Sequence, residues 1–596
     1  MGQAQSVSSI DKMSKTPSVK QKYDTIKDEV MRLKFKDYKY VRPDLNETKD
    51  AFNIALNRFK EASSIDDAEK AIDQINRLRF DFNTMSTLAY IRNSIDTNDT
   101  FYDQEKDFFD QNSPRFSQLN NLFYQALVKT KFRSELEQRK GALLFKKAEL
   151  SLTTFSPEIM QDLQEENILA SQFQKLMASA QIEFEGKKRN LSQMGPFSQS
   201  IDRNMRKKAS LATTGFLKQN EEKLDKIYDQ LVHVRDKIAK TLGYQSFIEL
   251  AYNRWGRTDY GPKDVAQFRK QVLEHVVPIN TMLTNQKQKR LKLDTLYHYD
   301  LALEFESGNP TPKGDKDWMV KKASQMYQEM SPETDEFFTF MKSRELLDLE
   351  AKKGKAGGGY CTFIANYDSP FIFSNFNGTK GDVDVLTHEA GHAFQMYMSR
   401  HHEVPEYMTS SQDIMEIHSM SMEFFAWPWV HLFFEEDTEK YKYTHLTYAL
   451  SLLAYTSAYD EFQHEIYANP ELSMAERKAV WRDIDKKYFP YKVYDDNDYL
   501  ERGNAWQNVM HLFAVPFYMI DYALAQVCAL QYWAESRIDR DTAWQSYLSL
   551  CKAGGSDSYL GLLKRAQRNN PFEAGSLKQV MPAIKQYLES IDDTKL

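Results

Sequence analysis

His388, Glu389 and His392 stand within the run DVDVLTHEAGHAFQMYMSR, and their types and spacing suit metal-assisted hydrolysis. On a helix, side chains four residues apart project from successive turns, so the two imidazoles can bind one metal ion. Glu389 lies about a quarter turn round the helix, where its carboxylate can reach a metal-bound water without becoming a ligand. The pattern predicts a catalytic zinc site, and the same donors also suit cobalt or manganese.

The residues around this motif divide into two faces at helical spacing. The polar face consists of Asp384, His388, His392, Gln395 and Ser399, and the opposite face of Leu386, Ala390, Ala393, Phe394 and Tyr397. We expect a buried helix whose polar stripe faces a cavity. Neutral imidazoles are costly to bury without polar partners, and a shared divalent cation supplies a partner to both. A satisfied pair of surface histidines is the alternative for the bare HExxH string.

A third protein ligand must come from outside this motif, because a catalytic zinc takes three protein ligands and keeps one position for water. The metzincin pattern fails, since Gln395 and Met398 stand where its glycine and third histidine belong. We therefore expect a carboxylate. The segment SSQDIMEIHSMSMEFFAWPW reads as a second helix with Glu416 and Glu423 on one face. Glu416 is the predicted third ligand.

Other polar residues near these helices receive structural interpretations. Glu403 and Glu406 follow the motif so closely that their ligand geometry would be poor, and we interpret them as solvated loop charges. His418 points away from the ligand face and is predicted to be a core or surface histidine. Ser410 and Asp413 are predicted to form a capping box that opens the second helix.

The paired motifs HEAGHAFQ and EIHSMSMEF resemble those of peptidase family M3, which includes thimet oligopeptidase and oligoendopeptidase F. The resemblance is greatest to the Pz-peptidase-like branch and runs from about Tyr38 to near the C-terminus. It implies one zinc ion per chain, bound by His388, His392 and Glu416, with Glu389 as the general base. The implied activity is that of a zinc-dependent oligoendopeptidase, which hydrolyses internal bonds of short, unfolded peptides.

In such a mechanism zinc polarises the scissile carbonyl and activates its water, while Glu389 takes the proton and later delivers it to the leaving amine. Oxyanion donors are expected in the stretch GNAWQNVMHLFAVPFYMIDYALAQ. There His511 is predicted to lie in a loop, and Pro516 to open a helix that carries Tyr518 and Tyr522. This resembles the family's histidine and tyrosine cluster, although two tyrosines at helical spacing are also typical of core packing.

Further residues are candidates for positioning the ligands. Asp384 lies one turn before His388 and is predicted to orient its ring, while Ser419 or Glu423 could do the same for another ligand. Asp384 also has a second interpretation. It stands near the start of the helix, where the helix dipole favours an acidic residue whether or not a metal is bound.

A glycine-rich stretch, GKAGGGYCTFIANYDSPFIFSNFNGTKGD, precedes the zinc helix and is the clearest β-like segment of the chain. We predict a hairpin or edge strand beside the site. Gly357, Gly358, Gly359 and Tyr360 are the candidate substrate-binding residues, because an edge strand can hold an extended peptide by main-chain hydrogen bonds. The alternative is a flexible connector. A phosphate loop is excluded, since the GxxxxGK[ST] order is missing.

Long stretches elsewhere show helical periodicity, so the fold is predicted to be mainly α. The resemblance implies a two-lobed helical zincin with a deep substrate channel and a small β-sheet beside the zinc site. We divide the chain into a flexible tail (1–20), an N-terminal helical region (21–200) and a catalytic region (201–596). The segment GKKRNLSQMGPFSQS marks the boundary between the two regions, and Gly243 is predicted to end a helix.

Composition restricts partners and compartment. A net charge of −7 without a Lys/Arg block argues against nucleic acid. No apolar run reaches bilayer length, and the N-terminus lacks a secretory signal. Three cysteines suit a reducing compartment, so cytoplasm is the predicted location. Gly2 and Ser6 fit a myristoylation pattern too loose to adopt. Short peptides are the expected partners, and no sequence feature specifies an oligomeric state.

Two rival classes differ from the endopeptidase in a recognisable way. An aminopeptidase on the same helix would need a site for a free substrate amine, and no GxMEN-like segment supplies one. A helical interaction protein with a structural metal would close its site with four protein ligands. Such a site has no use for a carboxylate placed as Glu389 is.

Overall fold

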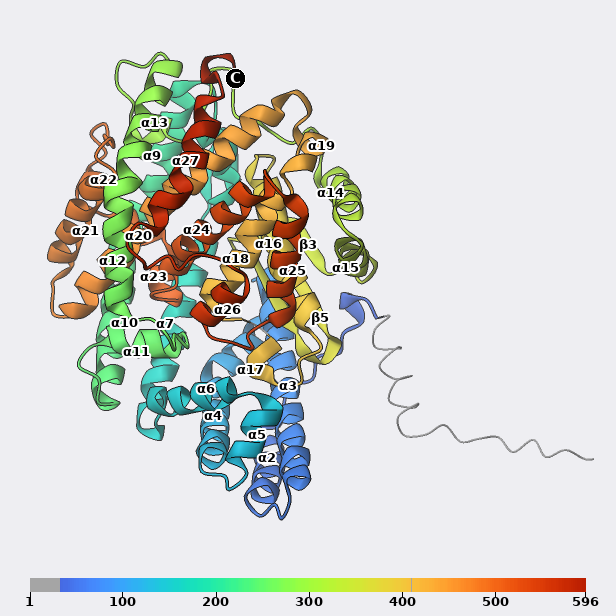
Figure 1. Ribbon diagram of the computed structural model, residues 1–596. Helices are drawn as coiled ribbons and strands as arrows, with labels where there is room; N and C mark the ends of the chain where they lie inside the picture. Colours follow the sequence, from blue (N-terminus) through green and yellow to red (C-terminus); the bar gives the residue numbers. More distant parts are fainter. Residues whose placement is uncertain (1–32, 409) are drawn as a thin grey trace, which may run out of the picture.

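The computed structural model describes residues 33–408 and 410–596, and these fold into a mainly helical protein with two small sheets, as predicted (Figure 1). The predicted tail at 1–20, the Gly2 pattern and residues 21–32 lie outside the described residues. Within residues 33–408 and 410–596, every helix is too short or too polar to cross a bilayer.

The first long helices surround a core of their own, in the lower part of Figure 1. They are α2 (Leu45–Lys60), α3 (Ile65–Ile95), α4 (Thr100–Val128), α5 (Arg133–Lys140) and α6 (Ala142–Thr154). Asp44 and Asp99 begin two of them by accepting hydrogen bonds from first-turn backbone N–H groups. Phe82 of α3 stacks on Phe116 of α4 with ring centroids 4.0 Å apart, which joins these helices at the centre of the core.

A larger core holds the remaining long helices, in the upper part of Figure 1. They are α7 (Met160–Ala178), α9 (Arg203–Gln219), α10 (Glu221–Thr241), α11 (Phe247–Arg254), α12 (Pro262–His275), α13 (Val277–Arg290), α14 (Lys316–Met330), α15 (Pro332–Ser343), α16 (Gly381–Ser399), α18 (Gln412–Phe425), α20 (Thr438–Ala468), α21 (Met474–Tyr488), α24 (Met519–Ser536), α25 (Arg540–Ala553) and α27 (Ser576–Glu589). Leu169 and Phe173 of α7 belong to this core. Gly243 follows α10 with φ +86°, which confirms the predicted helix end.

The predicted strand segment supplies two strands of a three-stranded sheet beside α16, and the third strand precedes it in sequence. Its strands are β3 (Leu347–Glu350), β4 (Tyr360–Ile364) and β5 (Ser369–Phe376), in the order β3-β5-β4. Strand β4 runs antiparallel to β5, and β3 runs parallel to it. Asp368 turns the chain between β4 and β5 with φ +45°. β4 is therefore an edge strand next to the helix that carries the HExxH motif. The second sheet is a hairpin of β1 (Ile182–Phe184) and β2 (Lys187–Arg189).

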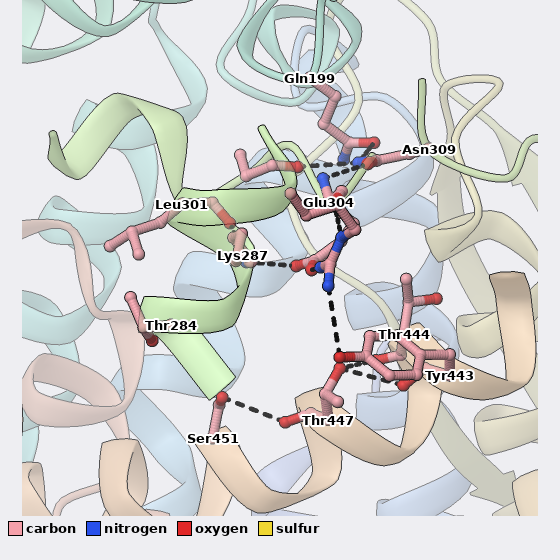
Figure 2. A network of polar contacts seen from close by, with 12 residues as sticks. Gln199, Thr284, Lys287, Leu301, Glu304, Asn309, Tyr443, Thr444, Thr447 and Ser451 are labelled. Atoms are coloured by element: carbon pink, nitrogen blue, oxygen red, sulfur yellow. Dashed lines mark hydrogen bonds and ion pairs between the residues drawn. The ribbon is translucent and has the colours of Figure 1, made fainter. Parts of the chain in front are cut away.

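Polar contacts fasten the irregular segment after α13 to its neighbours (Figure 2). Lys287 of α13 donates to the Leu301 carbonyl at 2.9 Å, and Arg290 donates to the Glu304 carbonyl at 2.8 Å. Arg290 also reaches the Tyr443 hydroxyl of α20 at 3.4 Å. Asn309 accepts from the Glu304 backbone N–H at 2.7 Å. Side chains thus replace regular backbone pairing in this segment.

Candidate metal centre

His388, His392 and Glu416 converge where α16 crosses α18. His388 Nε2 lies 3.2 Å from Glu416 Oε2, and His392 Nε2 lies 3.5 Å from the same oxygen. One ligand atom from each residue lies within 4.8 Å of the others. The Glu416 side chain is 1% exposed. Two imidazoles and one carboxylate form a donor set found at catalytic zinc sites, so these residues fit the metal that the motif predicts.

The charges of this cluster compensate one another. Burial alone would raise the pKa of Glu416, but His392 and His388 outweigh it and hold that pKa well below its ordinary value. Burial likewise lowers the pKa of His388, while its hydrogen bonds to Glu416 and Glu423 outweigh burial and raise the pKa well above the ordinary value. The carboxylates thus stabilise a positive charge on the His388 ring. The same groups are suited to bind a divalent cation.

Glu389 lies buried beside the ligands. Burial raises its pKa, and the nearby His388 and His392 oppose that effect. Among the described residues, its Oε2 atom has no hydrogen-bond partner. A buried, unpaired carboxylate oxygen requires a partner from outside the chain, and water at the metal would supply one.

Gly391 lets the two ligand helices approach closely. A Cβ atom at this position would lie 2.6 Å from Ser419 Cα and 2.7 Å from the His418 carbonyl oxygen. The glycine between the histidines therefore brings Glu416 of α18 within reach of α16. This function was not predicted, although the glycine stands inside the HEAGH motif.

The predicted capping box of α18 is wrong. The helix begins at Gln412 with Ser411 as its N-cap residue, one position later than the predicted Ser410. Asp413 accepts hydrogen bonds from the Ser411 hydroxyl and, at 2.7 Å, from the Tyr260 hydroxyl. Asp413 thus combines a local contact at the helix start with a tertiary contact. His418, in the same helix, is fully buried.

Glu423 occupies the far side of the His388 ring. Its Oε1 atom accepts from His388 Nδ1 at 2.7 Å, which leaves Nε2 free to face the metal position. Ser419 donates to Glu416 Oε2 at 3.0 Å. Asp384 does not take the predicted position beside His388. It forms an ion pair with Lys380 one turn earlier in sequence, as a helix-start acidic residue can.

Two residues that were not predicted extend this contact chain. Trp427 donates its Nε1–H to His445 Nδ1 at 3.1 Å, and His445 Nε2 lies 2.6 Å from Glu423 Oε2. Because Nδ1 accepts, the proton of a neutral His445 lies on Nε2 and points at Glu423. The chain therefore runs from Trp427 through His445 and Glu423 to His388. A histidine on a separate helix gives no local sequence signal of such a role.

His511, Tyr518 and Tyr522 face the ligands from another side. The Tyr518 hydroxyl donates to Glu416 Oε1, and the Tyr522 hydroxyl lies 3.1 Å from His511 Nε2. The rings of His511 and Tyr518 stack with centroids 5.5 Å apart. Burial lowers the pKa of His511 to about 4, so its ring is neutral near pH 7 and carries one N–H.

The predicted local structure of this segment needs two corrections. His511 lies in a short helix, α23 (Met510–Ala514), rather than in a loop. Helix α24 begins at Met519, so Pro516 does not open it and Tyr518 is its N-cap residue. The physical reason is Phe517, whose φ of +65° breaks helical geometry between the proline and α24.

Side chains from segments far away in sequence hold this non-helical backbone. Arg257 donates to the Phe517 carbonyl at 2.7 Å, and Trp255 donates to the Pro516 carbonyl at 2.7 Å. Gln463 accepts from the Phe517 N–H at 2.7 Å. Arg235 donates to the carbonyls of residues 512 and 513. None of these anchors was predicted, since they lie far from the segment in sequence.

The glycine-rich loop brings backbone beside Glu389. A Cβ atom at Gly359 would lie 3.5 Å from Glu389 Oε1, and Gly357 and Gly358 have open space around them. Asn375 donates to the Gly358 carbonyl at 2.8 Å, which ties the loop to β5. Tyr360 begins β4 and stacks on Phe373 with centroids 4.8 Å apart. The loop is therefore held against β5 and leads directly into the edge strand β4.

The two glutamates of the inter-helix turn differ. Glu403 is 81% exposed, as expected for a solvated charge. Glu406 is only 9% exposed and forms an ion pair of 2.6 Å with Arg79 of α3, so its predicted exposure is wrong. The Tyr124 hydroxyl also donates to Glu406. The turn that includes α17 (Pro405–Met408) is thereby fixed to the first group of helices.

Comparisons with known proteins agree with this architecture. A family model described as Peptidase M3 N-terminal domain matches residues 35–155, and one described as Peptidase family M3 matches residues 197–312 and 322–582. Oligopeptidase PepF of Bacillus subtilis (strain 168) is 23% identical over 95% of this chain and 85% of its own length.

Two solved structures are similar along almost the whole chain. Pz peptidase A, solved with an inhibitor, is 53% identical with a TM-score of 0.93, and the match covers 94% of this chain and all of that one. A structure named as an oligoendopeptidase F from Bacillus anthracis str. Ames is 52% identical with a TM-score of 0.89, covering 95% and 99%.

Proposed function

Because this chain belongs to peptidase family M3 and is therefore a metallopeptidase, we propose that it is a zinc-dependent oligoendopeptidase acting on internal bonds of short, unfolded peptides. One observation carries the proposal. His388, His392 and Glu416 converge within 4.8 Å, and the carboxylate of Glu389 lies buried beside them with an unpaired oxygen. A structural metal site would have no use for that carboxylate.

In this proposal His388, His392 and Glu416 hold one zinc ion per chain. Zinc bound there would polarise the scissile carbonyl and lower the pKa of a water molecule. Glu389 takes the proton from the attacking water and passes it to the leaving amine. Burial favours this role, because it raises the pKa of Glu389 and so strengthens the carboxylate as a base.

His511, Tyr518 and Tyr522 are the proposed donors to the oxyanion. Each carries a polar hydrogen, and all three lie on the face of the site next to Glu416. Donors that lie beside the metal position can stabilise developing negative charge, with Tyr518 turning its hydroxyl from Glu416 to the oxyanion. The neutral state of His511 keeps one N–H available near pH 7.

The edge strand β4 is the proposed binding site for the peptide backbone. An extended peptide can add to a free strand edge through main-chain hydrogen bonds, which require little of its sequence. Gly357, Gly358 and Gly359 would allow the peptide to approach Glu389, and Tyr360 begins the strand. Cytoplasm remains the proposed compartment, because Cys361, Cys528 and Cys551 are free thiols.

Cleavage of an internally quenched peptide, blocked at both ends, tests this function. Wild type should cut the peptide internally, and Glu389→Gln with matched zinc content should lose about 10²- to 10⁴-fold in kcat. Glu403→Gln is the matched control, since it changes an exposed carboxylate in the turn that follows α16. If only peptides with a free N-terminus are cleaved, the enzyme is an aminopeptidase. If wild type with bound zinc cuts nothing, the site is structural.

A further inference from the structure

Two tyrosines of α20, Tyr448 and Tyr455, expose their rings although protein surrounds them. Tyr448 is 57% exposed and Tyr455 is 37% exposed. Burial nevertheless raises the pKa of both hydroxyls above the ordinary value. Lys380, the N-cap residue of α16, lies beside the Tyr448 ring, and we call the two exposed rings of α20 the tyrosine wall.

This wall begins at the candidate metal centre. Lys380 Nζ lies 5.5 Å from the Tyr448 ring centroid and is paired with Asp384, one turn before His388 on α16. His445, which contacts Glu423, precedes Tyr448 by less than one turn of α20. Tyr448 therefore lies near the start of α16 and close in sequence to His445, which reaches His388 through Glu423.

Tyr455 extends the wall along α20. Two residues seven apart on a helix share one face and are separated by about 10 Å along its axis. That distance corresponds to about three residues of an extended peptide. Tyr455 packs edge-on against Tyr459 with centroids 4.7 Å apart, so its ring is held in place before any ligand binds.

Other tyrosines on the same helix show that core packing does not account for these two. Tyr441 is fully buried and stacks on Phe434, and Tyr459 is buried and stacks on Trp481. Tyr448 and Tyr455 instead leave large parts of their rings uncovered. The charge of Lys380 beside Tyr448 is already compensated by Asp384, so the wall offers ring surface without a free charge.

We propose that Tyr448 and Tyr455 form a substrate subsite that binds apolar or aromatic side chains of the peptide, within three residues of the scissile bond, by packing on their rings. The inference rests on the proposed endopeptidase function and adds a side-chain preference to it. Gly359, just before β4, lies beside Val385 and Glu389, whereas Tyr448 lies beside Lys380 at the start of the same helix. The two elements therefore approach α16 at different points.

Position-specific cleavage tests the subsite. Blocked, quenched peptides of one sequence would carry Phe, Leu or Ser at each of three positions on either side of the cut. Tyr448→Ala and Tyr455→Ala should lower kcat/KM about 3- to 10-fold for Phe and Leu at positions on one side, with little change for Ser. Tyr448→Phe and Tyr455→Phe should keep wild-type values, because the rings remain. Phe101→Ala is the control, since Phe101 is 51% exposed on α4.

A binding measurement separates this inference from the proposed function. In the Glu389→Gln background, peptide affinity is read without turnover, and Tyr448→Ala should weaken Phe-containing peptides by the same factor as it lowers kcat/KM. An equal loss for Phe and Ser peptides, a loss in the Phe variants, or no loss at all would overturn the subsite. If wild type binds the peptides but cleaves none of them, the endopeptidase function fails, and the affinities alone decide the subsite.

Discussion

The two sides of the candidate site are built in different ways. On the ligand side, His388, His392 and Glu416 project from the regular helices α16 and α18. On the other side, His511 and Tyr518 stand on a backbone that leaves helical geometry at Phe517, with φ +65°. Helical spacing alone brings the two histidines together. The donor side instead requires anchors from α10, α20 and the chain after α11.

Local helical spacing thus sets the geometry of one side of the site, and contacts between distant segments set the geometry of the other. The i,i+4 spacing of two histidines places their rings on one face of any helix that contains them. A residue with positive φ that is not glycine persists only when its surroundings impose it. Arg257 supplies part of that constraint, and it is itself buried in an ion pair of 2.7 Å with Asp521. The comparison predicts that the two sides can be disrupted independently.

The largest expected effect follows loss of a ligand. Glu416→Gln should abolish both bound zinc and peptidase activity, because the carboxylate contacts both histidines and is 1% exposed. The fold should survive, since the apolar cores do not depend on this group. Metal content by mass spectrometry and peptide cleavage measure the two effects. A variant that keeps stoichiometric zinc would remove Glu416 from the ligand set.

Loss of the main anchor of the donor side should cost stability while sparing the metal. Arg257→Met leaves Asp521 buried without its cation and should lower the free energy of unfolding by about 3–5 kcal/mol. Activity should fall as Tyr518 shifts, whereas zinc content stays unchanged. Urea unfolding and metal analysis test this. Lys237→Met is the control, because that ion pair with Asp162 is exposed on the lysine side and contributes about 0–1 kcal/mol.

The contact chain behind His388 should tune metal affinity. Glu423→Gln and His445→Phe each remove a partner of this chain and should weaken zinc binding about 10- to 100-fold. Competition with a chelator measures the dissociation constant. Asp384→Asn should leave the affinity unchanged, because Asp384 pairs with Lys380 and not with His388. If Asp384→Asn weakens zinc binding more than Glu423→Gln does, Asp384 orients the His388 ring as the sequence predicted.

A single methyl group should separate the ligand helices. Gly391→Ala places a Cβ atom 2.6 Å from Ser419 Cα and should destabilise the protein by about 1–3 kcal/mol through overpacking. Zinc affinity should fall too, because Glu416 moves away from α16. Gly215→Ala is the control. Gly215 lies within α9 with open space around it, so the same change there should add about 0.5–1 kcal/mol of stability. If both substitutions change the free energy of unfolding in the same direction, the close approach at Gly391 does not limit the packing of the two helices.

The smallest expected effect concerns one anchor hydrogen bond. Trp255→Phe removes the indole N–H that donates to the Pro516 carbonyl and should cost about 0.5–1.5 kcal/mol. Zinc content should not change. Thermal and urea unfolding, compared with Arg257→Met, show whether the two anchors act on the same backbone segment. Losses that simply add would mean that the anchors act independently.

The sequence predicted the residues whose partners lie on the same helix. His388 and His392 meet through one helical turn, and Glu416 and Glu423 share a face of the next helix. Ser419 contacts Glu416 one turn earlier in the same way. The edge strand was also predictable, because glycines and alternating β-branched or aromatic residues mark it locally. In each case the periodicity of the backbone supplies the geometry.

Predictions failed where a distant residue competes for the same group. Glu406 was expected in solvent, but Arg79, 327 residues away, pairs with it. Asp413 was expected to form a capping box with Ser410, but it binds Ser411 and the distant Tyr260. His445 and Trp427 have no local pattern that connects them to Glu423. A polar group forms its bonds with whichever partner folding brings near, and sequence separation carries little information about that.

By itself, the sequence determined the helix that carries the HExxH motif, the second helix that supplies a carboxylate and the mainly α class, because helical periodicity converts spacing into direction. Only the tertiary structure decided which carboxylate meets His388 Nδ1, how closely α16 and α18 approach at Gly391, and how Tyr518 reaches Glu416. These depend on contacts between segments far apart in the chain. Packing in three dimensions, and not local propensity, sets such contacts.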